Sequence, residues 1–262
     1  MRSRLNGFMR EARMAPRSQR TDKFGNRLLD AMAPKALDRI RRHLETVVLE
    51  VNQAIHQPGE IAKDVFFPTQ GLISIVTTMS DGASVEIGMV GKEGVFSVSA
   101  ILGDDRPPQN AMVQLPGRAF RMPSQLLRQE AQADTALQAQ LLRYVQAKLS
   151  MAGQAAACNR LHTLEQRCAR WLLSAHDRAE GDSFPMTHEF MSMMLGVRRA
   201  GVTVAAQGLQ SRALITYHRG TMSILDREGL EASSCECYHA IQAEFSRLLG
   251  WEGRTGRAPG TR

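Results

Sequence analysis

Residues 186–225 read MTHEFMSMMLGVRRAGVTVAAQGLQSRALITYHRGTMSIL and decide the fold of the C-terminal half. Thr187 suits a helix N-cap, and Glu189 in the first turn suits the positive end of the helix dipole. Gly196 is the residue type that ends a helix in a left-handed turn. A short helix is therefore predicted between these caps. The apolar residues at helical spacing in it are Phe190, Met193 and Met194.

A second helix is predicted from about Arg198 after a short turn. Its apolar face consists of Val202, Ala205 or Ala206, and Leu209. The helical period then turns a second set of residues outward, on a face suited to the DNA major groove. This set comprises Arg199, Ala200, Thr203, Val204 and Gln207. β-Forming residues at 214–217 and 221–225 flank His218-Arg219-Gly220, which predicts a β-hairpin.

With Leu-Gly-Val-Arg-Arg at the turn into the second helix, this segment resembles the winged helix-turn-helix of the Crp/Fnr family of bacterial transcription regulators. The resemblance implies binding to double-stranded DNA, with Arg199 in the base-reading position, where a guanidinium can bind guanine through two hydrogen bonds. Phosphate contacts are expected from Thr187, His188, Arg198, His218 and Arg219. Ala200 and Val204 replace a glutamate and an arginine of well-known members, so the preferred operator should differ from theirs. A helical hairpin in an unrelated α domain is the alternative, since Gly201 and Gly208 lower helix propensity.

The segment before this one changes to strand periodicity. Short β runs occupy residues 47–51, 65–67, 72–78, 84–90 and 111–115, with turn signals at 57–60, 69–71, 80–82 and 115–117. This pattern predicts an antiparallel roll. Pro58-Gly59-Glu60, Val65-Phe66-Phe67, Gly71 and residues 85–96 resemble the cyclic-nucleotide-binding roll of the same family.

The effector cannot be carried over from that resemblance. Cyclic-AMP-binding relatives use a glutamate, an Arg-Ser pair and, across the dimer, a Thr-Ser pair. The corresponding residues here are Gly91-Lys92, Gln109-Asn110 and Ala152-Gly153. Neutral amides lack the charge of an arginine fork, so cyclic AMP is not expected to bind. No ligand set for an iron–sulfur cluster or haem is evident, since the first cysteine is Cys158 and His56 is the lone histidine of the roll.

Residues 124–162 are predicted to be mostly helical and to carry a heptad seam in their second half. The seam residues are Leu142, Val145, Leu149, Ala152, Ala156 and Asn159. The family resemblance makes this a dimerisation helix, so a homodimer is expected. The same stripe would also suit a helix that packs only on its own roll.

The net charge of +7 lies in the N-terminal arm, because residues 1–45 hold 12 Lys or Arg against 5 Asp or Glu. Without an apolar stretch of about 18 residues, the chain is expected to be cytoplasmic and to have no membrane partner. Four cysteines fit a reduced compartment. Cys235 and Cys237 are too close in sequence for an ordinary zinc knuckle, so core or surface thiols are expected, with no metal and no cofactor.

The predicted fold class is α+β, with an antiparallel β-roll, a long dimerisation helix and a C-terminal winged helix-turn-helix. Its predicted divisions are a disordered basic arm (1–23), the roll (24–123), the dimerisation helix region (124–162), the DNA-binding domain (163–249) and a disordered tail (250–262). A regulatory module without DNA binding remains the alternative function. An enzyme is not expected, and Glu86 and Glu93 are interpreted as turn or surface residues. An unidentified effector and contact with RNA polymerase both stay open.

Overall fold

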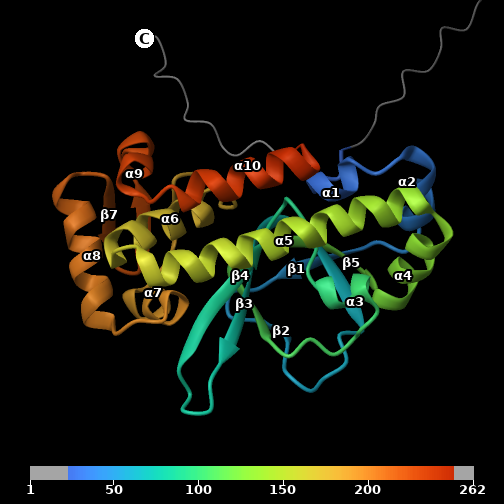
Figure 1. Ribbon diagram of the computed structural model, residues 1–262, viewed down its shortest axis with the longest axis horizontal. Coiled ribbons are helices and arrows are strands. Elements are labelled where there is room, and N and C mark those ends of the chain that lie inside the picture. Colours follow the sequence, from blue (N-terminus) through green and yellow to red (C-terminus); the bar gives the residue numbers. More distant parts are fainter. Residues whose placement is uncertain (1–22, 251–262) are drawn as a thin grey trace, which may run out of the picture.

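The computed structural model describes residues 23–250, so the predictions for residues 1–22 and 251–262 lie outside the described part. A β-roll and a small helical domain are joined by the long helix α5 (Thr135–Leu161), which crosses the molecule (Figure 1). The last helix, α10 (Cys237–Leu249), runs back beside α5. The predicted α+β architecture is therefore confirmed.

The roll is a five-stranded antiparallel sheet in the order β1-β5-β3-β4, with β2 also paired to β5. Its strands are β1 (Glu45–Leu49), β2 (Ala54–His56), β3 (Asp64–Thr78), β4 (Ser84–Val90) and β5 (Asn110–Pro123). The predicted turns at 69–71 and 115–117 are wrong, because both segments lie inside the continuous strands β3 and β5. They oppose each other where the register shifts, and a Cβ on Gly71 would lie 2.5 Å from the Leu115 carbonyl oxygen. The glycines thus allow two backbones to approach at a bulge.

Four short helices complete the first domain: α1 (Arg27–Asp30), α2 (Pro34–Arg41), α3 (Val98–Leu102) and α4 (Ser124–Ala133). Asn26 caps α1 by accepting from the Leu29 amide. Its Nδ2 donates to the carbonyl oxygens of Pro68 and Gly94, at 2.8 Å each. A single buried amide therefore holds the entering chain against the roll.

Helix α5 has two unlike faces. Tyr144 and Lys148 are buried against the roll, whereas Leu142 and Leu149 of the predicted seam are 46% and 68% exposed. Ala152, Ala156 and Asn159 are also exposed, and among the seam residues only Val145 is buried. A leucine and alanine stripe thus remains uncovered in the single chain.

The C-terminal domain contains α6 (Leu164–His176), α7 (His188–Leu195), α8 (Arg199–Ser211) and α9 (Arg227–Ser233). A three-stranded sheet in the order β6-β8-β7 flanks them, built from β6 (Ser183–Pro185), β7 (Ile215–His218) and β8 (Thr221–Ile224). Strand β6 thus lies in the segment that connects α6 to α7. Trp171 and Leu172 are buried in the core of this domain. Within residues 23–250, no helix combines the length and the apolar character that crossing a lipid bilayer requires.

Candidate nucleic-acid interface and effector region

The helix-turn-helix forms through the predicted caps. Thr187 Oγ1 accepts from the Phe190 amide at 3.1 Å, and Gly196 adopts the left-handed conformation with φ 64°. Helix α8 follows after two residues, with Arg198 as its N-cap. Met191 was not among the predicted apolar residues of α7, yet it is fully buried beside Met194 and Leu195. Phe190 and Met193 are only partly buried, so the packed face of α7 is rotated from the prediction.

Helix α8 packs through one face and leaves the other uncovered. Val202, Ala205, Ala206 and Leu209 are buried, so both predicted alanines contribute to the core. The other predicted positions are largely open to solvent. Exposed residues of the proposed interface are Thr187, Arg198, Arg199, Ala200, Val204, Gln207, His218 and Arg219.

His188 and Thr203 are half-buried and contact each other. His188 Nδ1 lies 3.2 Å from Thr203 Oγ1, and the imidazole stacks on Tyr217 of the wing with 4.3 Å between ring centroids. Burial, with the nearby charge of Arg199, lowers the pKa of His188. A neutral imidazole thus connects α7, α8 and β7, which fixes the angle of the wing on the two helices.

The wing is a tight hairpin between β7 and β8, as predicted. Its two central residues, Arg219 and Gly220, both have positive φ values, 47° and 81°. This is the geometry of a type I′ turn, whose twist matches that of the paired strands. Arg219 is therefore presented at the exposed tip, close in the fold to the N-cap of α7, since a Cβ on Gly220 would contact Thr187.

The glycine-rich segment after β4 is filled by charged groups of the chain itself. Glu93 Oε1 lies 2.8 Å from Arg178 Nη2, and the two side chains are 1% and 3% exposed. A Cβ on Gly91 would collide with the Arg178 side chain. Burial would raise the pKa of Glu93, but the charges of Arg178 and Lys148 hold it below its ordinary value. The prediction that Glu93 is a turn or surface residue is wrong, because its partner comes from the other domain.

Helix α5 covers the same segment. Tyr144 donates its hydroxyl to the Val95 carbonyl at 3.0 Å, and its ring occupies the space that a side chain at Gly94 would need. Lys148 Nζ donates to the Met89 carbonyl at 2.7 Å, and burial lowers its pKa to about 8. The protein's own side chains therefore surround residues 91–94 from two directions.

Within a single chain, the predicted effector residues lie on separate elements. Asn110 is paired with Val76 on β3, whereas Val90, the neighbour of Gly91, is paired with Ile73. The two pairing positions on β3, Ile73 and Val76, are three residues apart, which is about 10 Å along the strand. Lys92 accepts from the Arg27 amide through its carbonyl oxygen. The remaining candidates are Gln109, next to Asn110, and Ala152 and Gly153, which lie on the exposed face of α5.

Glu86 joins the two domains. Its carboxylate accepts from Ser74 Oγ at 2.7 Å and from Trp171 Nε1 at 3.0 Å. Burial of the carboxylate raises the pKa of Glu86 to about 7. The interpretation of Glu86 as a turn or surface residue is therefore wrong too. The cavity beside it, between β4, α5 and α6, measures about 40 Å³, well below the roughly 300 Å³ of the smallest usual ligand pockets.

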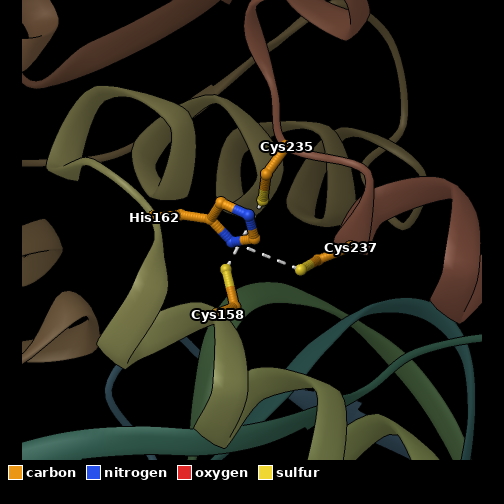
Figure 2. A group of neighbouring side chains, drawn as sticks. All are labelled: Cys158, His162, Cys235 and Cys237. Carbon is orange, nitrogen blue, oxygen red and sulfur yellow. Dashed lines mark hydrogen bonds between the residues drawn. The ribbon is translucent and has the colours of Figure 1, made fainter.

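A second group of side chains gathers where α5 ends and α10 begins. Figure 2 shows one imidazole and three thiols pointing toward one another. Their donor atoms all lie within 4.8 Å of one another. We call this group the thiol–imidazole cluster; it consists of Cys158, His162, Cys235 and Cys237.

Comparison with known families assigns both halves of the chain. Residues 46–134 match the cyclic nucleotide-binding domain, and residues 166–233 match the Crp-like helix-turn-helix domain. The chain thus belongs to the Crp/Fnr family of transcription regulators, and its matches are regulators rather than enzymes. The fold and the recognition of the family predicted above are confirmed.

Solved structures share the fold at low sequence identity. FixK2 from Bradyrhizobium japonicum superposes with a TM-score of 0.63 at 16% identity, over 73% of this chain and 98% of FixK2. A Crp/Fnr-family regulator from Eubacterium rectale superposes with a TM-score of 0.63 at 16% sequence identity, and the match covers 78% of this chain and 96% of that regulator. TTHB099, a CRP-family regulator from Thermus thermophilus, superposes with a TM-score of 0.61 at 18% sequence identity, and the match covers 72% of this chain and 96% of TTHB099. No curated protein matches the sequence significantly.

Proposed function

We propose that this regulator binds a pseudo-palindromic DNA operator as a cytoplasmic homodimer, without requiring cyclic AMP. The observation that carries the proposal is the exposed face of α8, which presents Arg198 and Arg199 beside a wing tipped by Arg219. A helix whose polar face is uncovered, next to a basic hairpin, suits major-groove binding with flanking phosphate contacts.

Arg199 is the residue proposed to read a base. It lies at the first position of α8, where side chains of a recognition helix reach base edges. Ala200 and Val204 offer apolar contact to a thymine methyl group, and Gln207 offers an amide. Arg198 at the N-cap, like Thr187 and the wing residues, suits phosphate contact. Because Thr203 already pairs with His188, these two residues support the interface more than they bind DNA.

The exposed seam of α5 supports the homodimer. Leu142 and Leu149 would be costly to leave in water, and the alanines between them allow a second helix to approach closely. Two-fold symmetry of the protein would then be mirrored in the operator, with half-sites about one DNA turn apart.

The contents of the effector region support independence from cyclic AMP. The position where relatives hold the nucleotide contains the buried Glu93–Arg178 pair, so charged groups of the chain itself occupy it. An effector that opens this region would have to displace Arg178, which belongs to the DNA-binding half. Contact with RNA polymerase is a further part of the proposal, since regulators of this type act at promoters.

The test is selection of bound duplexes from random DNA by the full chain without added ligand. A two-fold-symmetric motif is expected, and Arg199→Ala should relax one position at a cost of about 1–3 kcal/mol. Arg247→Ala, which removes an exposed arginine of α10, should keep the motif. A motif that appears only with cyclic AMP would overturn the ligand independence. Failure with any ligand would favour a regulatory module without DNA binding.

The dimer is tested separately by sedimentation velocity. Leu149→Arg places a charge in the seam and should yield monomers, because the charge would be buried between two helices. Leu102→Arg is the matched control, since Leu102 is 61% exposed at the end of α3, away from the seam. A dimer that survives Leu149→Arg would assign the interface elsewhere.

A further inference from the structure

The thiol–imidazole cluster is assembled from two distant segments. Cys158 and His162 are four residues apart, which places them on one face at the end of α5. Cys235 lies in the link from α9 to α10, and Cys237 is the first residue of α10. The three cysteines are buried and form a small core of their own. Cys168, the remaining cysteine, is buried in the core of the DNA-binding domain and takes no part.

The distances fit a single tetrahedral ion. With Zn–S bonds of ~2.3 Å and Zn–N bonds of ~2.0 Å, tetrahedral edges are about 3.8 Å between sulfurs and about 3.5 Å between sulfur and nitrogen. Cys158 Sγ lies 3.5 Å from Cys235 Sγ, and Cys237 Sγ lies 3.5 Å from His162 Nδ1. The longest separation, within 4.8 Å, needs only side-chain rotation to close. The group is too compact for a cluster of several irons.

Neighbouring side chains orient the ligands. His162 turns Nδ1 toward the sulfurs, while its Nε2 lies 3.2 Å from the Glu236 carboxylate. A carboxylate that accepts from the far nitrogen of an imidazole fixes the tautomer and strengthens the near nitrogen as a metal ligand. Gln154 Nε2 also donates to Cys237 Sγ at 3.0 Å, which suits a thiolate.

The electrostatic surroundings suit an anionic site. Three thiolates around a divalent cation carry one net negative charge. Arg167 and Arg170 of α6 both interact electrostatically with Cys158. Within residues 23–250, the buried Nε of each arginine has no hydrogen-bond partner. These two cations would balance the charge of the occupied site.

We propose that the thiol–imidazole cluster binds one Zn²⁺ ion per chain. Three sulfurs and one nitrogen form a closed tetrahedral set, the donor type of structural zinc sites, with no position left for a substrate. A disulfide between Cys158 and Cys235 would use two of the four groups and would leave the pairing of His162 with Glu236 without a role. The ion would fasten α10 to the end of α5, at the two-residue link that leads into α6.

The direct experiment is elemental analysis of the full chain purified under reducing conditions without chelator. About one zinc per chain is expected, with loss of the metal in Cys158→Ala and Cys237→Ala. Cys168→Ala is the matched control, since it removes a buried thiol outside the cluster, and it should retain the ion. Zinc that persists in both cluster variants would overturn the proposal.

Cobalt provides a readout that does not depend on a variant folding. Wild-type protein stripped of metal and titrated with Co²⁺ should show thiolate charge-transfer bands and the intense visible absorption of tetrahedral cobalt, abolished by one equivalent of Zn²⁺. Reduced protein that takes up neither metal would refute the site. So would a Cys158–Cys235 disulfide found by peptide mapping in protein isolated without any chelator or metal-stripping step.

Glu236 is proposed as a positioning residue. Glu236→Gln should keep the cobalt spectrum but weaken zinc affinity roughly 10-fold to 100-fold, because the imidazole loses its charged partner. Glu228→Gln, an exposed carboxylate on α9, should leave affinity unchanged. Equal affinities in these two variants would remove Glu236 from the site.

Discussion

The recognition face of α8 and the effector region of the roll are built in opposite ways. On α8, Arg198 and Arg199 stand exposed, with hydrogen-bonding capacity left for another molecule. In the roll, Glu93 is buried and paired with Arg178, which is a buried residue of the DNA-binding half. The polar groups of the first region are exposed to a partner molecule, whereas those of the second region are paired within one chain. On the proposed function, the family fold keeps its DNA-binding surface here, while a joint between domains stands where relatives hold an effector.

The largest effect is expected from breaking that joint. Glu93→Gln removes the buried carboxylate that pairs with Arg178 and should cost about 3–5 kcal/mol of unfolding free energy, measured by urea denaturation. Glu60→Gln, an exposed glutamate of the roll, should cost almost nothing. Adding Arg178→Met to Glu93→Gln should recover part of the loss. A cost below about 1 kcal/mol for the single variant would mean that the pair does not hold the domains.

A smaller effect should follow from the carboxylate of Glu86. Burial raises its pKa in the folded state to about 7 from an ordinary 4.5, so the folded protein binds one more proton than the unfolded chain between these values. Stability should therefore fall as pH rises from about 4.5 to 7, by up to about 3 kcal/mol in total, and level off above pH 7. Unfolding by urea at a series of pH values tests this, with Glu86→Gln expected to remove the decline. An identical decline in that variant would assign it to another group.

The smallest effect concerns the wing. Arg219→Ala should weaken binding to all DNA sequences alike and reduce the slope of log affinity against log salt by about 1, because one phosphate contact is lost. Filter binding or fluorescence anisotropy at several salt concentrations measures it, with Arg247→Ala as control. A change in base preference would instead place Arg219 in a groove, and Arg219 would then read bases, as proposed for Arg199.

Local signals explain most of what the sequence predicts correctly. The caps Thr187 and Gly196, the buried face of α8 and the hairpin at Arg219-Gly220 each depend on residues within a few positions. The heptad seam follows from spacing along one helix. In each case the structure depends on capping, on turn geometry or on the helical period, and a single short segment determines each of these.

The failures involve partners that are far apart in sequence. Gly71 and Gly117 resemble turn residues until their strands are aligned, when they prove to permit a bulge. Glu93 contacts Arg178, which lies 85 residues later in the sequence, and Cys158 contacts Cys235, which lies 77 residues later. In the proposed zinc site, Cys235 and Cys237 would act together with Cys158 and His162, which lie far from them in the sequence. Tertiary packing determines these pairings, and the spacing of residues along the sequence does not predict them.

Helix α10 has a consequence for how the protein is made. Phe245 is buried in the same core as Leu28 and Leu29 of α1, so the chain's last described helix completes the packing of its first. During synthesis the roll emerges from the ribosome long before this helix does. The core of the N-terminal domain consequently keeps apolar surface uncovered until α10 has been synthesised. Nascent chains that end before residue 237 should therefore expose this surface to chaperones.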